Sequence, residues 1–428
     1  MPPERNRFDM AAMQFYKAET WDVMQYFFSE FNDHQIHCVM RPEGRIDAER
    51  LERAADLLAA SFPILRSRFA VRGGIPRWED SGSLPSPIVA VKTAADPEAE
   101  TDRLIGSRND EHSGPQMRIF LVRGEQSDVL CAVINHMLCD AAGFKELLYR
   151  LCAIYSRLRT EPDFHPQPET APRNARQVLD ALGRKRRFLL FFRPYSLSRH
   201  DDSVVLRLTG DRNTPFLAAR TVPQDRFLAA KKYASEHGAT VNDLILAAYL
   251  RALQKFLPGR DTAIQCIVDL RKYLPDPHAE RICNLTSNLA CDIGADVGTD
   301  FGDTLLLVKR AMDEEKQRDN CLHLVALLEF VFHLFPFPLL KKAVLKSYRN
   351  PPLAMSNIGI LDHRRLVFDG APVRSAYMSG SVKYRPYFQL AVSTYRDEAT
   401  LSAAFHGTPA DRAAVTRFLA AVEAELPG

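Results

Sequence analysis

Short β-prone stretches and longer stretches of helical periodicity alternate along the chain, and this mixed order predicts an α/β or α+β fold. The stretches Met117–Arg123 and Asp128–Asn135 are apolar and β-prone, and the polar residues 124–127 separate them. They predict a β-hairpin whose second strand ends at Asn135. Upstream, Asp47 can cap a helix that runs to about Ser61. Its buried face would consist of Leu51, Ala54, Ala55 and Leu58.

The rest of the chain has comparable signals. Thr240 can cap a helix from Val241 to about Phe256. Residues 387–395 and 400–406 predict paired strands, and a last helix is expected to begin at Thr408-Pro409. Another helix is expected directly after Asp140, where apolar residues recur at helical spacing: Phe144, Leu147, Leu148, Leu151, Ile154 and Tyr155.

Residues from about 161 to 220 lose any regular period. Four prolines open this segment, a basic run at 184–187 follows, and a polar stretch closes it. Such a composition predicts a linker between two halves of the chain. We therefore expect a first lobe over residues 1–160, a linker over 161–220 and a second lobe over 221–428.

The composition is that of an ordinary globular protein. Of the 428 residues, 46% are hydrophobic and 25% are charged, and the net charge of +3 is too weak to indicate a nucleic-acid partner. The eight cysteines form no Cys-x-x-Cys pair, which favours reduced thiols in the core. No apolar segment is long enough for a signal peptide or a membrane span, so we expect a cytoplasmic protein.

The segment His136-Met137-Leu138-Cys139-Asp140 follows directly on the second strand of the predicted hairpin. A histidine at the end of a strand can reach a substrate, and a neutral imidazole with an ordinary pKa of about 6.5 suits a general base at neutral pH. We expect Asp140 to fix the loop that carries the imidazole rather than to touch the reactants. A Gly-x-Ser-x-Gly segment is missing, which argues against a hydrolase triad.

Five landmarks in order carry a resemblance over nearly the whole chain. They are residues 65–69, 136–140 and 239–243, residues 268–271 together with Asn284, and residues 356–359. With these landmarks the chain resembles the CoA-dependent acyltransferase superfamily, which includes chloramphenicol acetyltransferase, nonribosomal peptide condensation domains and alcohol acyltransferases. The resemblance implies two chloramphenicol-acetyltransferase-like lobes in a V-shaped pseudo-dimer, with His136 in the middle of a tunnel between them. It also implies a role in secondary metabolism.

The resemblance further implies roles for individual residues. His136 would be the catalytic base, and Asp140 would support the site. A buried carboxylate without a partner is costly, so an arginine should pair with Asp140. The resemblance points to Arg66 as this partner, and Arg271 is the second candidate.

Donors to a developing oxyanion, or residues lining the tunnel, are expected in several segments. Ser356 and Asn357 form one candidate pair, because the resemblance puts their segment close to the site. Ser379, Ser381 and Tyr384 lie near the expected crossover between the lobes. The other candidates are Asn135, Gly143 and Asn284. Asn284 and Asn357 have an alternative role as turn caps.

The chain departs from the pattern of the superfamily at two positions. Asn135 stands where condensation domains usually have a second histidine, a change that is tolerable because that histidine is assigned a supporting role. Ala141 replaces the glycine that usually follows the aspartate, and Gly143 comes two residues later. The added methyl group of Ala141 can narrow the space beside the imidazole, so it bears on rate and substrate size.

Three other features have an interpretation of their own. His34 and His37 have a short spacing, but no second cluster completes a metal site, so we expect ordinary strand residues and no metal. The basic run 184–187 could contact a CoA phosphate, a carrier protein or an anionic membrane, and a solvated linker helix is the favoured interpretation. The apolar residues 324–340 could line an acyl pocket or lie on a bilayer, and packing between the lobes is the simpler account.

Together these observations predict an acyltransferase that moves an acyl group from a thioester to an alcohol or amine. His136 acts as general base without a covalent acyl-enzyme, because a thioester is already activated and a ternary complex brings donor and acceptor together. The donor is acyl-CoA or a phosphopantetheinyl thioester on a carrier protein, the acceptor is a small molecule, and no cofactor is tightly bound. A stand-alone, amide-forming condensation enzyme and a non-catalytic relative that binds a carrier or partner protein are the alternatives. We expect a monomer, with peripheral membrane contact as an open alternative.

Overall fold

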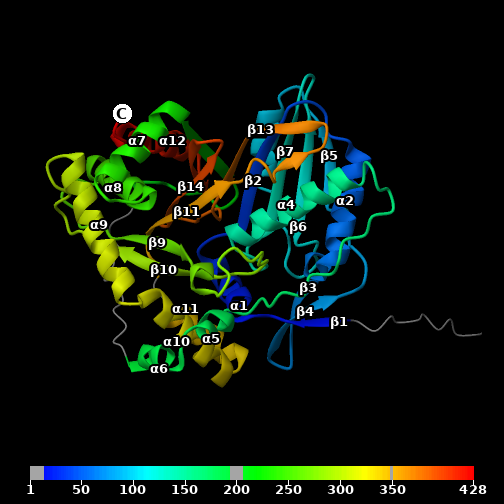
Figure 1. The fold of residues 1–428 in the computed structure, drawn as a ribbon, viewed down its shortest axis with the longest axis horizontal. Coiled ribbons are helices and arrows are strands. Elements are labelled where there is room, and N and C mark those ends of the chain that lie inside the picture. Colours follow the sequence, from blue (N-terminus) through cyan, green and yellow to red (C-terminus); the bar gives the residue numbers. More distant parts are fainter. Residues whose placement is uncertain (1–13, 193–205, 348–349) are drawn as a thin grey trace, which may run out of the picture.

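The computed structural model describes residues 14–192, 206–347 and 350–428. Figure 1 shows two lobes side by side, each built around a six-stranded sheet. The mixed α/β class predicted from the sequence is confirmed. Residues 1–13 and residues 193–205 of the expected linker lie outside the described residues.

The sheet of the first lobe has the strand order β12-β13-β2-β7-β6-β5. The predicted hairpin of β6 and β7 is present, with Met117 opposite Ile134 and Arg123 opposite Asp128. Strand β13 comes from the second half of the chain and pairs with β2, so late residues complete the early sheet. The strands are β2 (Gln35–Pro42), β5 (Val89–Thr93), β6 (Met117–Arg123), β7 (Asp128–Asn135), β12 (Val367–Phe368) and β13 (Ala371–Ser379).

The sheet of the second lobe has the order β10-β9-β11-β14-β15-β8. The predicted pairing of β14 with β15 is present, and the left-handed Arg396 and Asp397 form the tight turn between these strands. Strand β8 arises from the end of the expected linker and forms an edge of this sheet. The strands are β8 (Pro215–Val222), β9 (Ile264–Asp269), β10 (Thr286–Cys291), β11 (Leu353–Leu361), β14 (Phe388–Tyr395) and β15 (Glu398–His406).

A small three-stranded sheet lies beside the two lobes (Figure 1). The small sheet has the order β1-β4-β3, with β1 (Gln14–Lys17), β3 (Arg68–Arg72) and β4 (Ile75–Asp80). The helices are α1 (Thr20–Phe27), α2 (Ala48–Ser61), α3 (Pro97–Leu104), α4 (Ala141–Arg157), α5 (Arg176–Ala181), α6 (Arg184–Phe192), α7 (Gln224–Glu236), α8 (Val241–Phe256), α9 (Phe301–Gln317), α10 (Asn320–Leu334), α11 (Phe337–Ser347) and α12 (Pro409–Glu425). The expected linker thus contains α5 and α6 in addition to most of β8.

The caps predicted from the sequence begin their helices. Asp47 accepts a hydrogen bond from the backbone of Arg50 at the start of α2, and Thr240 forms a reciprocal capping box with Asp243 at the start of α8. Helix α8 is buried over most of its length and packs against α9 and α12. Helices α2 and α4 pack together over the first lobe (Figure 1).

The segment 380–387 crosses from β13 in the first sheet to β14 in the second. The backbone of Lys383 accepts a hydrogen bond from His406 N at 2.9 Å and donates one to Ala404 O at 3.0 Å. The neighbouring Tyr384 N donates to Phe31 O at 3.1 Å, so the crossover is tied to the loop before β2 as well. This crossover is one wall of the cavity described next.

Candidate active site

A cavity between the two lobes contains His136 in its wall. The walls come from α1, the turn between β7 and α4, strands β9, β10 and β11, and the crossover segment. Among the candidate residues, His136, Asp140, Ser356, Asn357, Ser379 and Ser381 line the cavity. The cavity therefore brings together residues that are more than 200 positions apart in the sequence.

The backbone of His136 is held from both lobes. Its N–H donates to His34 O at 2.8 Å within the first lobe. Its carbonyl accepts a hydrogen bond from Asn284 Nδ2 at 2.9 Å, and Asn284 precedes β10 of the second lobe. Asn284 also donates to Met137 O at 3.1 Å. Asn284 is therefore a positioning residue and does not line the cavity.

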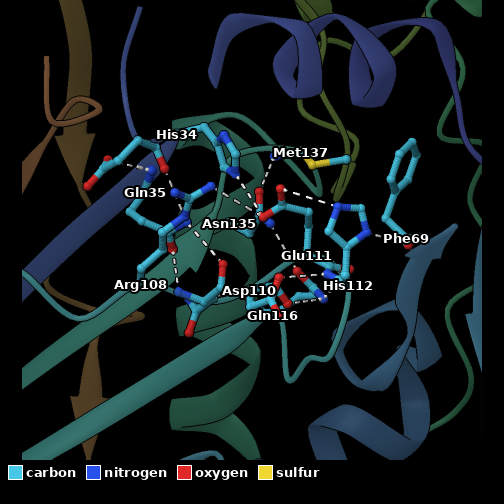
Figure 2. A network of polar contacts seen from close by, with 12 residues as sticks. His34, Gln35, Phe69, Arg108, Asp110, Glu111, His112, Gln116, Asn135 and Met137 are labelled. Atoms are coloured by element: carbon cyan, nitrogen blue, oxygen red, sulfur yellow. Dashed lines mark hydrogen bonds and ion pairs between the residues drawn. The ribbon is translucent and has the colours of Figure 1, made fainter. Parts of the chain in front are cut away.

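Asn135 fixes the turn that follows β7. Its side chain accepts a hydrogen bond from Met137 N at 3.0 Å and donates one to Gln116 Oε1 at 3.0 Å (Figure 2). Asn135 is fully buried and lies outside the cavity wall. The position at which condensation domains usually have a second histidine is therefore occupied here by a structural amide.

The polar network around Asn135 includes a buried pair of His34 and Glu111 (Figure 2). His34 Nε2 lies 3.5 Å from Glu111 Oε2, and Arg108 lies 3.6 Å from the same carboxylate oxygen. Burial raises the pKa of Glu111, but its contact with His34 outweighs this effect and lowers the pKa to about 2. The contact between the two side chains supports the backbone of His34, which in turn holds His136.

Asp140 pairs with Arg271 rather than with Arg66. Arg271 Nη1 and Nη2 donate to the two carboxylate oxygens of Asp140 at 2.8 Å and 3.0 Å. Two backbone amides, Gly143 N at 2.9 Å and Leu285 N at 2.8 Å, complete the shell of Asp140. Burial raises the pKa of Asp140, but the charge of Arg271 and these hydrogen bonds outweigh it, so the pKa is lowered.

The expectation that Arg66 is the partner of Asp140 is wrong. Arg66 ends a short 3-10 turn beside the small sheet, where its guanidinium donates to both carboxylate oxygens of Asp80 at 2.9 Å and 3.0 Å. Arg271, the second candidate, lies just after β9 of the second lobe. The support of the turn that carries His136 is therefore a contact between lobes.

Gly143 is required by packing. A Cβ atom at this position would lie 2.7 Å from Cys139 Cβ and 3.1 Å from Cys283 N. Gly143 thus lets the first turn of α4 approach the second lobe, and it does not line the cavity. Ala141 lines the cavity, so its methyl group does narrow the space near His136.

The imidazole of His136 is suited to act as a base. Burial lowers its pKa below the ordinary value of 6.5, and the charge of Lys383 acts in the same direction, while Asp140 partly offsets them. The Nδ1 atom has no hydrogen-bond partner among the described residues. Asp140 is fully engaged with Arg271 and backbone amides, so it orients the turn and takes no proton from the imidazole.

The oxyanion candidates differ in how much hydrogen-bonding capacity they have left. Ser379 Oγ donates to Gly380 O at 3.1 Å and lies 3.2 Å from His37 Nδ1. Asn357 Oδ1 accepts from Gly359 N at 3.0 Å, which leaves the Asn357 amide as a donor. The hydroxyl of Ser356 has no hydrogen bond within the described ranges of the chain. Tyr384 lies outside the cavity wall.

Sequence reasoning missed two lysines and several amides of the cavity wall. Lys145 on α4 donates to the carbonyls of Ile358 and Ile360 at 2.9 Å and 3.1 Å, which ties α4 to β11 of the second lobe. Lys383 lines the cavity from the crossover. The other polar residues that were missed include the amides Gln25, Gln265, Asn288 and Gln389. They fall on separate elements and form no motif, so the sequence gives no signal for them. Lys383 could have been identified, because it lies near the expected crossover between the lobes.

Comparisons with known proteins agree with this fold. Residues 282–417 match the family model described as the WS/DGAT C-terminal domain. The first condensation domain of the CDA synthetase is similar at 16% identity and a TM-score of 0.66, over 98% of each chain. Trichothecene 15-O-acetyltransferase from Fusarium sporotrichioides is similar at 12% identity and a TM-score of 0.68, over 97% of this chain and 96% of that one. The chain therefore shares its fold with these condensation and acetyltransferase structures.

The resemblance drawn from the sequence is confirmed at this level. The same fold is found in the epimerization domain from the third module of tyrocidine synthetase B, at 13% identity, a TM-score of 0.66 and coverage of 99% of each chain. The fold alone therefore does not select one reaction, and function must be argued from the site. A search with the sequence finds no significant match among curated proteins.

Within the described ranges, no helix is long and apolar enough to cross a membrane. The described residues also contain no group of three or more His, Cys, Asp or Glu side chains that could hold a metal ion. All eight cysteines are buried free thiols.

Proposed function

We propose that the protein transfers an acyl group from a thioester to an alcohol or amine, with His136 as general base. The observation that carries the proposal is the placement of His136 in the cavity between the lobes, with its backbone held from both sides and its pKa lowered. The match to the WS/DGAT C-terminal domain and the structural similarity to a condensation domain and an acetyltransferase support an acyltransferase or condensation-type activity in general.

The reaction requires one proton to be moved twice. The imidazole takes the proton from the hydroxyl or amine of the acceptor as that atom attacks the thioester carbonyl. The tetrahedral intermediate collapses with cleavage of the carbon–sulfur bond, and the proton passes from the imidazolium to the thiolate that leaves. The products are an ester or amide and a free thiol, and no bond between protein and acyl group is needed.

Ser356 and Asn357 are the best-placed groups for the oxyanion of this intermediate. Both line the cavity from β11, and the hydroxyl of Ser356 and the amide of Asn357 have donors to offer. Removing one oxyanion donor typically lowers kcat by two to three orders of magnitude. Asp140 and Arg271 keep the turn in place and take no part in proton transfer.

The donor is either acyl-CoA or a phosphopantetheinyl thioester on a carrier protein. Both present the same thioester to His136, so the chemistry in the cavity is the same for both. An ester-forming enzyme and an amide-forming enzyme differ in the acceptor nucleophile.

The test is the release of free thiol from acyl-CoAs of short to long chain length, with pooled alcohols and amines as acceptors. Release that depends on the acceptor should be abolished in His136→Ala. The matched control is His278→Ala, since His278 is exposed and does not line the cavity. The control should retain wild-type turnover.

If no acyl-CoA releases free thiol, the same assay should be carried out with acyl groups loaded on a carrier protein. Silence with these donors as well, from a folded protein, would refute the proposal. Binding of a partner that is unchanged in His136→Ala would then support a non-catalytic role.

A further inference from the structure

A half-buried lysine without a salt-bridge partner among the described residues lines the cavity that contains His136. Lys383 lies on the crossover, and backbone hydrogen bonds to Ala404 and His406 of the second lobe fix its position. Within the described ranges, no carboxylate lies within ion-pairing distance of its ammonium group. The nearest influence of opposite sign is Asp33, which lies 3.5 Å from His406 and accepts a hydrogen bond from Gln35 N.

The environment of this ammonium group is unfavourable without a ligand. Burial lowers the pKa of Lys383 to about 8, and Asp33 offsets only part of this effect. Burial of a charge without a partner is costly, and such charges in proteins are usually paired. The other lysine of the cavity, Lys145, already donates to two carbonyls, and Arg271 is committed to Asp140. Among the lysines and arginines described at this cavity, Lys383 is thus the one with capacity for an anion.

The wall of the cavity also contains several amides. Gln265 and Asn288 lie on β9 and β10, and Gln389 lies on β14. Their side chains make no hydrogen bond to another described residue, so they can bind a polar ligand. Lys383 and His136 line the same cavity, and the charge of Lys383 lowers the pKa of His136.

We propose that Lys383 binds an anionic substituent of the substrate beside the atom that reacts. This inference rests on the proposed function and names the substrate class. The substituent belongs either to the acceptor, as in a hydroxy acid or amino acid, or to the acyl group, as in a dicarboxylic acyl thioester. Both sources present the same carboxylate to the lysine.

The experiment compares matched substrates in wild type and Lys383→Met. Hydroxy acids and amino acids are compared with their methyl esters as acceptors, and succinyl-CoA with acetyl-CoA as donors. Wild type should favour the anionic member of one of these sets by about tenfold to a hundredfold in kcat/KM, as expected for a charge-assisted hydrogen bond. Lys383→Met should remove the preference, and Lys383→Arg should keep part of it.

Comparing the acceptor set with the donor set shows which substrate carries the anion, and it also shows whether the proposal fails. Loss of preference among acceptors only assigns the anion to the acceptor, and loss among donors only assigns it to the acyl group. An equal loss of turnover for charged and neutral substrates in Lys383→Met would overturn the proposal, because it would indicate an oxyanion or structural role. Lys232→Met, at an exposed lysine on α7, is the matched control and should leave the preference unchanged.

A binding measurement separates this inference from the proposed activity. Trp21 lines the cavity, and the other tryptophan, Trp78, is buried and bonded to Asp22. The intrinsic fluorescence should therefore respond when a hydroxy acid, an amino acid or succinyl-CoA binds, even in His136→Ala. If the fluorescence responds to the anionic compounds and Lys383→Met weakens this response, the result supports the inference even when no turnover is detected. Equal binding of the anionic compounds by wild type and Lys383→Met would refute it and leave the acyl-transfer proposal untouched.

An independent observation concerns the surface formed by α6, α10 and α11, which Figure 1 shows together at one end of the molecule. We call it the helical face. Eight of the seventeen exposed large apolar side chains in the described part of the chain lie on it. They are Phe188, Leu189, Leu327, Phe330, Leu334, Phe335, Leu339 and Leu345. The connection between α10 and α11 also lines a groove with the turn between β3 and β4, where Ile75 is 66% exposed.

The charged side chains of α6 and α11 are all basic, and two of them, Arg186 and Arg187, pair with Asp319 and Asp180. Arg184 and Lys185 are exposed on α6, and Lys342 and Lys346 are exposed on α11. Neither α6 nor α11 contains an acidic residue, and Glu329 of α10 is buried. An apolar surface flanked by lysines and arginines has the character of an interfacial membrane-binding element.

We infer that the helical face binds the surface of a bilayer that contains anionic lipid. Flotation of the full chain with vesicles should show binding to phosphatidylcholine mixed with phosphatidylglycerol and much weaker binding to phosphatidylcholine alone. Lys342→Gln/Lys346→Gln should weaken binding by about fivefold per charge, and raised salt should act in the same direction. Leu334→Ser/Leu339→Ser should abolish it.

The control for this test is Leu306→Ser, since Leu306 is 53% exposed on α9 of the second lobe. It should leave vesicle binding unchanged. Absence of binding to either vesicle, or equal binding by the leucine variant and wild type, would refute the inference. Capture of a protein partner by this face without any lipid binding would refute it as well.

Discussion

Replacing Arg271 by methionine tests whether the two lobes hold the catalytic turn. The substitution keeps an unbranched apolar stem but removes both hydrogen bonds to Asp140, at 2.8 Å and 3.0 Å. Asp140 is only 2% exposed, so its carboxylate would stay buried with two backbone amides as its remaining partners. Breaking a buried ion pair on one side typically costs about 3–5 kcal/mol.

We expect Arg271→Met to lower the free energy of unfolding in urea by about that amount, and to lower kcat because the turn carries His136. The loss should shrink as the pH falls. In wild type the pKa of Asp140 is lowered, so its contribution is complete above its unfolded pKa and is lost as the pH falls through its folded pKa. Without Arg271, burial dominates and raises this pKa, so protonation at mildly acidic pH removes the uncompensated charge.

Two further variants complete the test. Asp140→Asn combined with Arg271→Met should cost less than the sum of the single changes, because the pair interacts directly. Arg66→Met should leave kcat unchanged, since Arg66 pairs with Asp80. A loss of less than about 1 kcal/mol in Arg271→Met at neutral pH, or a loss that grows on acidification, would refute the reasoning.

Three further predictions follow from the geometry of the site. The acid limb of kcat/KM should have its midpoint below pH 6.5, because burial lowers the pKa of His136, and a midpoint above this value in a pH–rate profile would contradict that assignment. Asn284→Ala removes the donor to the carbonyl of His136, so kcat should fall by about tenfold or more with little change in KM. An unchanged kcat in steady-state kinetics would show that this hydrogen bond is dispensable. Gly143→Ala should lower the free energy of unfolding by about 1–3 kcal/mol in a urea titration, since the new methyl group would lie 2.7 Å from Cys139 Cβ. A variant as stable as wild type would contradict this close packing.

Local features of the fold could be predicted because their signals are local. Helix α8 has the predicted bounds, since Thr240 caps it and its apolar stripe repeats at helical spacing. Both predicted hairpins are present for the same reason. The short helix α5 in the expected linker was missed, because six residues give too few turns for a periodic pattern. Helix α6 agrees with the linker helix expected at the basic run 184–187.

Non-local pairings could not be predicted in the same way. Strand β13 joins the first sheet from far along the chain, and no local pattern distinguishes this from pairing within the second lobe. The choice between Arg66 and Arg271 for Asp140 depended on which lobe lies closer to the turn. His136 was identified because a strand end and a motif coincide there, whereas Lys383 lies near it only after the crossover folds back.

The contacts of the catalytic turn explain why two docked lobes are needed for one histidine. The first lobe supplies β7 and the carbonyl of His34, which position the backbone N–H of His136. The second lobe supplies Asn284 for the carbonyl of His136 and Arg271 for Asp140. Since each contact fixes a different atom of the turn, neither lobe alone can orient the imidazole toward the cavity. The orientation of the base is therefore a property of the lobe interface, and the same interface encloses the cavity in which the base would act.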